Sequence, residues 1–144
     1  MSVKEALEQT TKNMKRWQKI EKAAVRQTSL IMEKTEHPLI RMVCEIIQQD
    51  SQMHYRVQQL ISDSIEKKQI NIDPRQISKV WQLVEEHIEL EKKTIQLAKK
   101  SLKALEGTKH PIQQYLLEYL QMDEEKHDKL LENLNGIKLK MYPY

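Results

Sequence analysis

The sequence has few of the residues that build turns, disulfides or aromatic cores. Its 144 residues include two glycines, four prolines, one cysteine and no phenylalanine. So few glycines and prolines argue against the many tight turns of a sheet protein, while residues that favour helices are abundant. The lone Cys44 excludes a disulfide within the chain. The composition therefore predicts an all-α fold.

Long apolar runs and charge of one sign are also lacking. No run approaches the roughly 18 apolar residues of a membrane span, and the start MSVKEALEQTT lacks the apolar core of a signal peptide. We therefore expect a cytoplasmic protein without a membrane partner. The 24 Lys and Arg and the 21 Asp and Glu are interleaved and give a net charge of +3. Because no basic stripe with interleaved aromatic residues is present, nucleic acid is not an expected partner.

Apolar residues recur at helical spacing in four segments. The predicted helices cover residues 3–34, 38–67, 74–105 and 111–135, and a C-terminal tail follows over residues 136–144. A proline suits the first turn of each of the last three helices. Asp73 and Gln76 fit a capping box at the start of the third helix, and Gly107 fits its end.

Two His-Pro dipeptides indicate an internal repeat. His37 precedes His54 by the same 17 residues that separate His110 from His127, so the two copies are offset by 73. Short connections after the first and third helices predict two antiparallel hairpins. Hairpins of this length bury their apolar stripes best as one antiparallel four-helix bundle, which we expect to form a single domain over residues 1–135.

Three polar residues stand in the predicted apolar stripes. Glu91 lies on the stripe of the third helix, and Glu124 and His127 are three residues apart, on one face of the fourth. A buried carboxylate is costly unless it is paired, protonated or bound to a cation. One Glu facing a Glu-x-x-His motif is a donor set suited to iron, manganese or zinc, and it matches the pattern known from di-metal carboxylate bundles.

This combination resembles the rubrerythrin and ferritin-like family. Glu91 precedes Glu124 by 33 residues and His127 by 36, a spacing similar to that in the family's helix pairs. The segments HPLIRMVCEIIQQD and HPIQQYLLEYLQMDEEKH are similar to the family's run from helix start to ligand motif. As architecture, the resemblance covers nearly the whole chain. It implies a ferritin-like bundle with two metal half-sites, and chemistry with oxygen or peroxide.

The first half of the chain departs from the family's pattern. With an offset of 73, Gln18 takes the place of Glu91 and Ser51 that of Glu124, while His54 matches His127. This alignment leaves the first half-site without its two carboxylates. One divalent ion is neutralised by two carboxylates, whereas two ions would leave an excess of positive charge in the core.

We therefore predict one divalent ion per chain, iron in the first place, with manganese or zinc as alternatives. Its predicted ligands are Glu91, Glu124, His127 and His54. Three further residues could contribute. Glu21 or Asp50 would restore an anion and allow a second ion if the helices are shifted, and His87 could bind the metal or orient Glu91.

Two functions are compatible with these residues. The first is a ferritin-like metal protein with an oxygen- or peroxide-related redox role, which as an enzyme would be a non-haem iron or manganese oxidoreductase. The second is a non-catalytic bundle for binding or assembly, whose core Glu and His layer is a remnant without metal. A homodimer is the expected assembly, because twofold dimers are the commonest.

Overall fold

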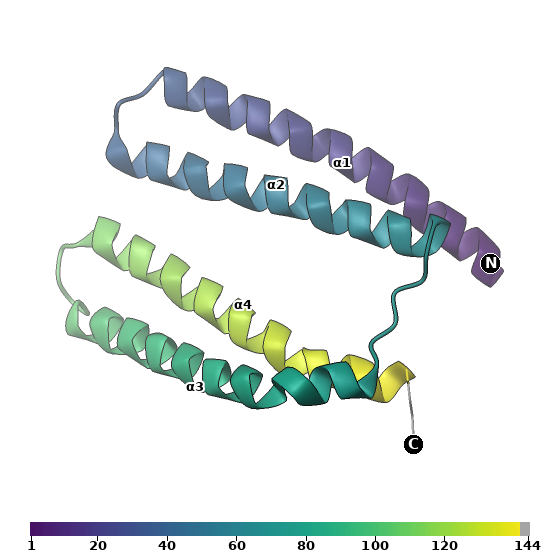
Figure 1. Ribbon diagram of the computed structural model, residues 1–144. Helices are drawn as coiled ribbons and strands as arrows, with labels where there is room; N and C mark the ends of the chain where they lie inside the picture. The colour runs from purple at the N-terminus through teal and green to yellow at the C-terminus, as the bar shows by residue number, and fades with distance from the viewer. Residues whose placement is uncertain (142–144) are drawn as a thin grey trace. The chain divides into compact units, whose positions relative to one another are not determined.

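The computed structural model describes the backbone of residues 1–141 and, within that range, every side chain except those of residues 138, 139 and 141. This part of the chain forms four α-helices and no strand (Figure 1). The helices are α1 (Val3–Glu33), α2 (Pro38–Glu66), α3 (Pro74–Ala104) and α4 (Pro111–Met141). The all-α prediction is confirmed, and the first three helices end within one residue of their predicted ends.

Local side chains explain where the helices begin. The Asp73 carboxylate accepts from the start of α3 and the Gln76 side chain accepts from the Asp73 N–H, so the predicted capping box is present. Ser2 and Glu5 form the same motif at α1. Gly107 has φ 76°, a left-handed conformation that glycine adopts without strain, in the turn after α3.

The fourth helix is longer than predicted. It continues through Gly136 to Met141, so the tail predicted from residue 136 is wrong over residues 136–141, and residues 142–144 lie outside the described range. Glycine costs a helix only about 1 kcal/mol relative to alanine. Apolar residues at helical spacing continue across Gly136, from Leu134 to Ile137, and they favour continuation of the helix past the glycine.

The chain divides into two compact units, Met1–Ile70 and Asn71–Tyr144. We call the α1–α2 pair hairpin 1 and the α3–α4 pair hairpin 2. In hairpin 1 the start of α1 lies beside the end of α2, because Lys15 Nζ is 3.2 Å from Glu66 Oε1. In each hairpin the two helices run in opposite directions (Figure 1). The packing of both hairpins into one domain and one four-helix bundle stays a prediction.

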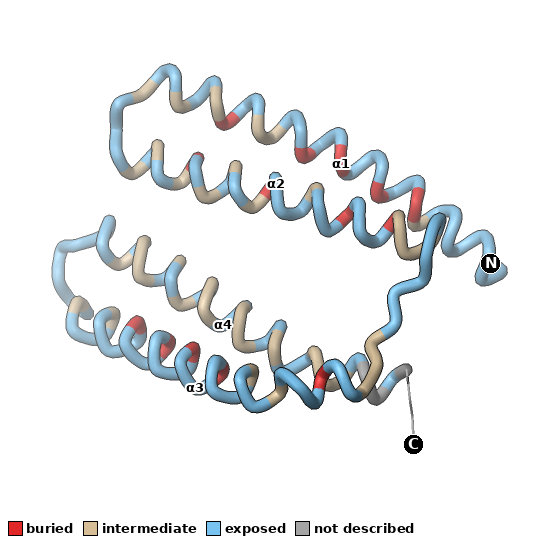
Figure 2. The backbone as a smooth tube through the Cα atoms, in the orientation of Figure 1, coloured by how far each residue is buried: buried red, intermediate tan, exposed pale blue. Residues whose placement is uncertain are grey.

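The buried residues of each hairpin line the seam between its two helices (Figure 2). The seam of hairpin 2 is mostly apolar, with Ile88, Ile95 and Ala98 on α3. That of hairpin 1 is more polar, because Gln18 and Gln58 are buried there. The Gln18 amide donates to the carbonyl of Tyr55 at 3.2 Å and to Gln59 at 3.0 Å. These bonds offset the cost of burying the amide.

Each hairpin also leaves large apolar side chains exposed. Ile20 is 64% exposed, Leu83 66% and Leu130 64%. Apolar surface of this extent is usually covered in a folded protein, which is what the predicted bundle would do. None of the helices, over the described residues, has a stretch apolar enough to cross a membrane.

The bundle predicts the cost of deleting side chains at two positions of α3. Ile88 is buried in the seam of hairpin 2, so Ile88→Ala should destabilise the protein by about 2–5 kcal/mol. In a bundle Leu83 also loses its exposure, and Leu83→Ala should cost a similar amount. Urea unfolding followed by circular dichroism measures both changes. A cost below about 0.5 kcal/mol at Leu83 beside a large cost at Ile88 would contradict the bundle.

Candidate metal site

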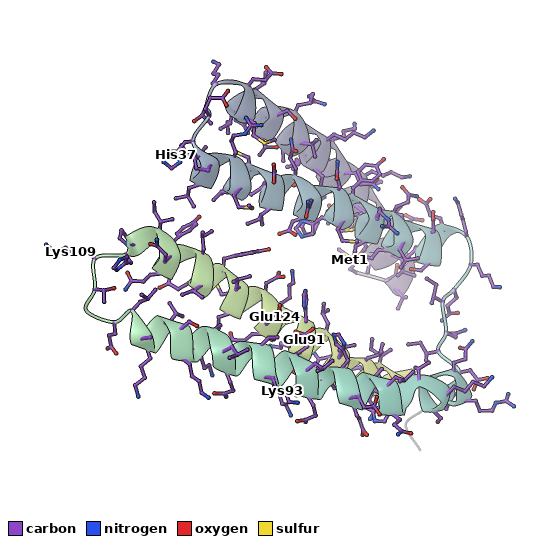
Figure 3. All side chains as sticks on the ribbon, turned by 60° about the vertical axis from the view of Figure 1, so that its left-hand side comes forward. Met1, His37, Glu91, Lys93, Lys109 and Glu124 are labelled. Atoms are coloured by element: carbon purple, nitrogen blue, oxygen red, sulfur yellow. The ribbon has the colours of Figure 1, made fainter. Side chains whose placement is uncertain are left out.

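Three of the predicted ligands come together in hairpin 2. Glu91 of α3 and Glu124 and His127 of α4 each offer a donor atom, and these atoms all lie within 4.8 Å of one another. We call these residues the metal triad. Figure 3 shows Glu91 and Glu124 at neighbouring points of the two helices. Over the described residues, no other group of three or more carboxylate, imidazole or thiol side chains meets this distance.

The helix faces explain this convergence. Glu91 lies between Ile88 and Ile95 on the buried seam, so its side chain is directed at α4 and is only 8% exposed. Glu124 and His127 are one turn apart and point to the same side. Their side chains are 26% and 40% exposed, which leaves the triad accessible from one side in this unit.

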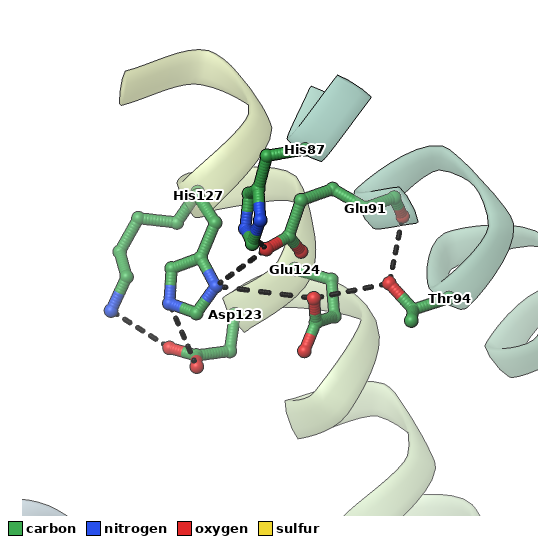
Figure 4. A network of polar contacts seen from close by, with 7 residues as sticks. His87, Glu91, Thr94, Asp123, Glu124 and His127 are labelled. Carbon is green, nitrogen blue, oxygen red and sulfur yellow. Dashed lines mark hydrogen bonds and ion pairs between the residues drawn. The ribbon is translucent and has the colours of Figure 1, made fainter. Parts of the chain in front are cut away.

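The His127 ring lies between the two glutamates of the triad and Asp123 (Figure 4). Its Nδ1 lies 3.5 Å from Glu91 Oε1 and 3.9 Å from Glu124 Oε2, whereas its Nε2 lies 3.4 Å from Asp123 Oδ2. When the ring proton is on Nε2, it interacts with Asp123, and the lone pair of Nδ1 then points toward Glu91 and Glu124. A carboxylate behind a ligand imidazole is the usual way in which proteins orient the ring and raise its basicity.

Glu91 has one satisfied and one unsatisfied oxygen. Its Oε1 lies 2.8 Å from His87 Nε2, so His87 is beside the triad as predicted. Its Oε2 is shielded from solvent and has no hydrogen-bond partner. A buried carboxylate oxygen without a donor needs a proton or a cation nearby. The triad therefore has the donors and the unmet charge of a cation site.

Two neighbours of the triad were not predicted from the sequence. The Thr94 hydroxyl donates to Glu124 Oε2 at 3.0 Å, and Asp123 contacts the outer nitrogen of His127 (Figure 4). Asp123 stands four residues before His127, so the rule that such residues are neighbours on a helix could have identified it. Thr94 had no such signal, because its partner is on the other helix.

The two carboxyl groups of the triad differ in proton affinity. The pKa of Glu124 is raised, because the Glu91 carboxyl beside it and then burial favour its protonated form. The pKa of Glu91 is lowered, first by its interaction with the Glu124 carboxyl and then by His87 and His127. Without a metal, these shifts favour a proton on Glu124 over one on Glu91. A bound cation would take the place of that proton.

Hairpin 1 holds a smaller version of this arrangement. Glu21 is buried, its Oε1 accepts from the Trp17 indole N–H at 3.0 Å, and its Oε2 has no hydrogen-bond partner. His54 Nδ1 lies 3.6 Å from that oxygen. The predicted ligand His54 thus pairs with Glu21 in the described structure, while buried Ser51 stands where a second carboxylate would complete the set.

These contacts correct the alignment of the two halves. Glu21, not Gln18, is the counterpart of Glu91, because each contacts the histidine of its own hairpin through Nδ1. The buried positions of α1 and α3 match at an offset of 70, whereas the histidines are 73 apart. The connection of hairpin 2 (residues 105–110) is two residues longer than that of hairpin 1 (residues 34–37), and α3 ends one residue later than an offset of 70 would place it; together these give the register shift of three residues. On this alignment hairpin 1 lacks one of the two carboxylates of hairpin 2, at Ser51, and not both.

Of the remaining candidates, Asp50 has no hydrogen bond or ion pair with the described residues and stands half-buried next to Ser51. Beside the triad, an apolar groove of about 430 Å³ is lined by Val80, Leu83, Leu130 and Leu131. Apolar walls lower the local dielectric and strengthen the electrostatic interactions of the triad.

Comparison of the chain with protein-family models, with curated proteins and with solved structures gave no match. The ferritin-like resemblance therefore rests on the sequence pattern alone.

The raised pKa of Glu124 predicts how the stability of the metal-free protein depends on pH. The folded state holds the Glu124 proton more tightly than the unfolded state. The stability that this proton contributes is therefore complete below the ordinary value of 4.5 and is lost as pH rises through the raised pKa. Glu124→Gln mimics the protonated group, so it should be more stable than the wild type at neutral pH and equally stable at acid pH.

Urea unfolding with a chelator present measures this difference in stability between Glu124→Gln and the wild type. An unchanged pH profile would contradict the shared proton, and Glu125→Gln, one residue along, is the matched control.

His87 is predicted to orient Glu91 instead of binding the metal, because its Nε2 is at hydrogen-bond distance from Oε1. His87→Gln should weaken Co²⁺ binding by about 10–100-fold, the usual effect of losing such a partner. The visible spectrum of the bound Co²⁺ should not change. A spectrum that indicates a lost nitrogen ligand would show that His87 binds the metal, and His110→Gln serves as the control.

Proposed function

We propose that this chain is a ferritin-like metal-binding protein whose incomplete di-metal site holds one divalent ion. The metal triad of hairpin 2 provides the site, with an oxygen from Glu91, an oxygen from Glu124 and Nδ1 of His127. The observation that supports it is the convergence of these three donors within 4.8 Å around a buried carboxylate oxygen without a partner.

The charge of the triad favours a single ion. Glu91 and Glu124 together neutralise one divalent cation, and the neutral imidazole adds no charge. Carboxylate and imidazole donors suit iron, manganese and zinc. Iron is our first choice because the resemblance implies it. Three ligands leave further coordination positions for water or a substrate oxygen, as in catalytic metal sites.

Hairpin 1 supports one ion in preference to two. Glu21 and His54 provide a single carboxylate and a single imidazole, and Ser51 provides no anion. Two donors hold an ion less firmly than the triad does, so we assign the ion to hairpin 2. A second ion would require Glu21 and His54 to gain a further ligand.

An oxygen- or peroxide-related redox role is part of the proposal and rests on the ferritin-like resemblance. A bound redox-active ion would supply the electron transfer. The residues of this chain would hold the ion in place and exclude water along the apolar groove. We further propose a cytoplasmic location and a single four-helix bundle, in which the exposed apolar faces of the hairpins are covered.

A second candidate function is a non-catalytic bundle for binding or assembly. One observation favours it. The triad and its neighbours already form hydrogen bonds among themselves, from His87 to Glu91 and from Thr94 to Glu124. Such a polar layer can specify a core without metal. Only Glu91 Oε2 then depends on the Glu124 proton.

Metal content distinguishes the two functions. Protein expressed with iron, manganese and zinc available should contain about one equivalent of metal per chain by elemental analysis. The double variant Glu124→Ala, His127→Ala should lose it, because only Glu91 of the triad remains. The double variant Glu125→Ala, His110→Ala removes the same residue types outside the triad and should retain it.

The other outcomes are equally informative. Two equivalents would show that Glu21 and His54 form a second site, and Glu21→Gln should then remove one of the two. A wild-type protein without metal, even after incubation with Fe²⁺, Mn²⁺ or Zn²⁺ under anaerobic conditions, would reject the metal proposal in favour of the polar layer.

A further inference from the structure

The two hairpins differ in charge on one pair of equivalent faces. This face lies on the side of each hairpin that is away from its histidine ring, His54 in hairpin 1 and His127 in hairpin 2. The equivalent residue in hairpin 2 is found by adding 70 to a residue number on α1 and 73 to a residue number on α2. In hairpin 1 this face carries four exposed cations and one carboxylate, the buried Glu21, between residues 19–26 and 52–59. We call it the basic face, and its cations are Lys19, Lys22, Arg26 and Arg56.

The corresponding face of hairpin 2 is acidic. It carries five carboxylates, Glu85, Glu89, Glu125, Asp128 and Glu132, which we call the acidic face. In hairpin 1 the equivalent positions hold Lys15, Lys19, Gln52, Tyr55 and Gln59. Lys92 and Lys129 interrupt the acidic face without cancelling it. The same surface of the repeat has therefore acquired opposite charge in its two copies.

The cations of the basic face are available to a partner. Lys19, Lys22, Arg26 and Arg56 are exposed, and over the described residues none of them forms an ion pair with a carboxylate. Lys22 Nζ lies 5.4 Å from the centre of the Tyr55 ring, which holds this cation over the seam. Four unpaired cations close together repel one another, so an anionic surface placed against them gains free energy.

Both faces are hollowed and partly apolar. A groove of about 580 Å³ on the basic face is lined by Val25 and Tyr55 together with the cations and the buried Glu21. One of about 640 Å³ on the acidic face is lined by Trp81 and Ile88 together with Glu85, Glu89 and Glu132. Apolar floors with charged rims are typical of surfaces that bind other proteins.

We propose that the basic face of one copy of this chain binds the acidic face of a second copy. The complementary charge of the two faces is what selects a second copy as the partner. Each face extends roughly 17 Å along its helices and about 20 Å across them, so one contact covers roughly 340 Å² per copy. Stable interfaces bury about 800 Å² per partner, so we expect this association to be weak.

This interface is independent of the metal triad and of its function. Apart from the half-buried Asp128, the charges lie on exposed side chains, so the attraction is screened by salt. Sedimentation velocity should show association at about 0.05 M NaCl that weakens about tenfold or more at about 0.5 M NaCl. A wild-type chain that remains monomeric at high micromolar concentration and low salt overturns the proposal, and leaves the basic face to a different anionic partner.

Charge reversal tests the two faces separately. Arg26→Glu with Arg56→Glu leaves two cations and two carboxylates at the four positions of the basic face, and Glu89→Lys with Glu132→Lys leaves three carboxylates beside four cations on the acidic face. Each double variant alone should associate about tenfold more weakly than the wild type, because the attraction between the two faces is removed. An equimolar mixture should associate again, since the first variant keeps its acidic face and the second keeps its basic face.

Two controls change net charge by the same amounts in the connections between helices. They are Lys68→Glu with Lys109→Glu and Glu36→Lys with Glu106→Lys. Both should associate like the wild type. Equal weakening in the controls, or no recovery in the mixture although circular dichroism shows both variants folded, overturns the assignment of these faces.

Discussion

A carboxylate held out of water is the constraint on which hairpin 2 depends. Glu91 lies between two buried isoleucines, where an ionised group costs several kcal/mol unless its charge is compensated. The groups around it each compensate part of that charge: the His87 and His127 rings, and the proton carried by Glu124. One oxygen depends on whether that proton or a cation is present. The triad is thus arranged to receive either a proton or a cation.

The helices and the triad follow from features that are local in the sequence. Prolines and capping residues act within one turn, so the starts of all four helices were predictable. The triad was predictable because Glu124 and His127 share a helix face at any register, and Glu91 stands on the only stripe that can face them. The end of α4 was not, because the small helix penalty of Gly136 is outweighed by the apolar residues on either side.

The comparison of the two halves depended on the register between the two helices of each hairpin, which the sequence does not show directly. Aligning the His-Pro dipeptides fixes the second helix of each hairpin but not the first, because a connection can change length without changing its ends. Glu21 was therefore misaligned by one turn. The hydrogen bond from Trp17 to that carboxylate was not predictable either, because in the sequence Trp17 resembles an ordinary core aromatic residue.

The shifted register has a wider meaning for how such hairpins diverge. Three residues advance a helix by about 4.5 Å and turn it by 300°, which nearly restores its original face. A connection that grows by about this amount can therefore slide one helix along its partner while its inner side still points inward. Small insertions in the loop between paired helices then slide one helix along its axis relative to the other. In a duplicated chain, such an insertion can place different side chains opposite the same histidine without any substitution in either helix.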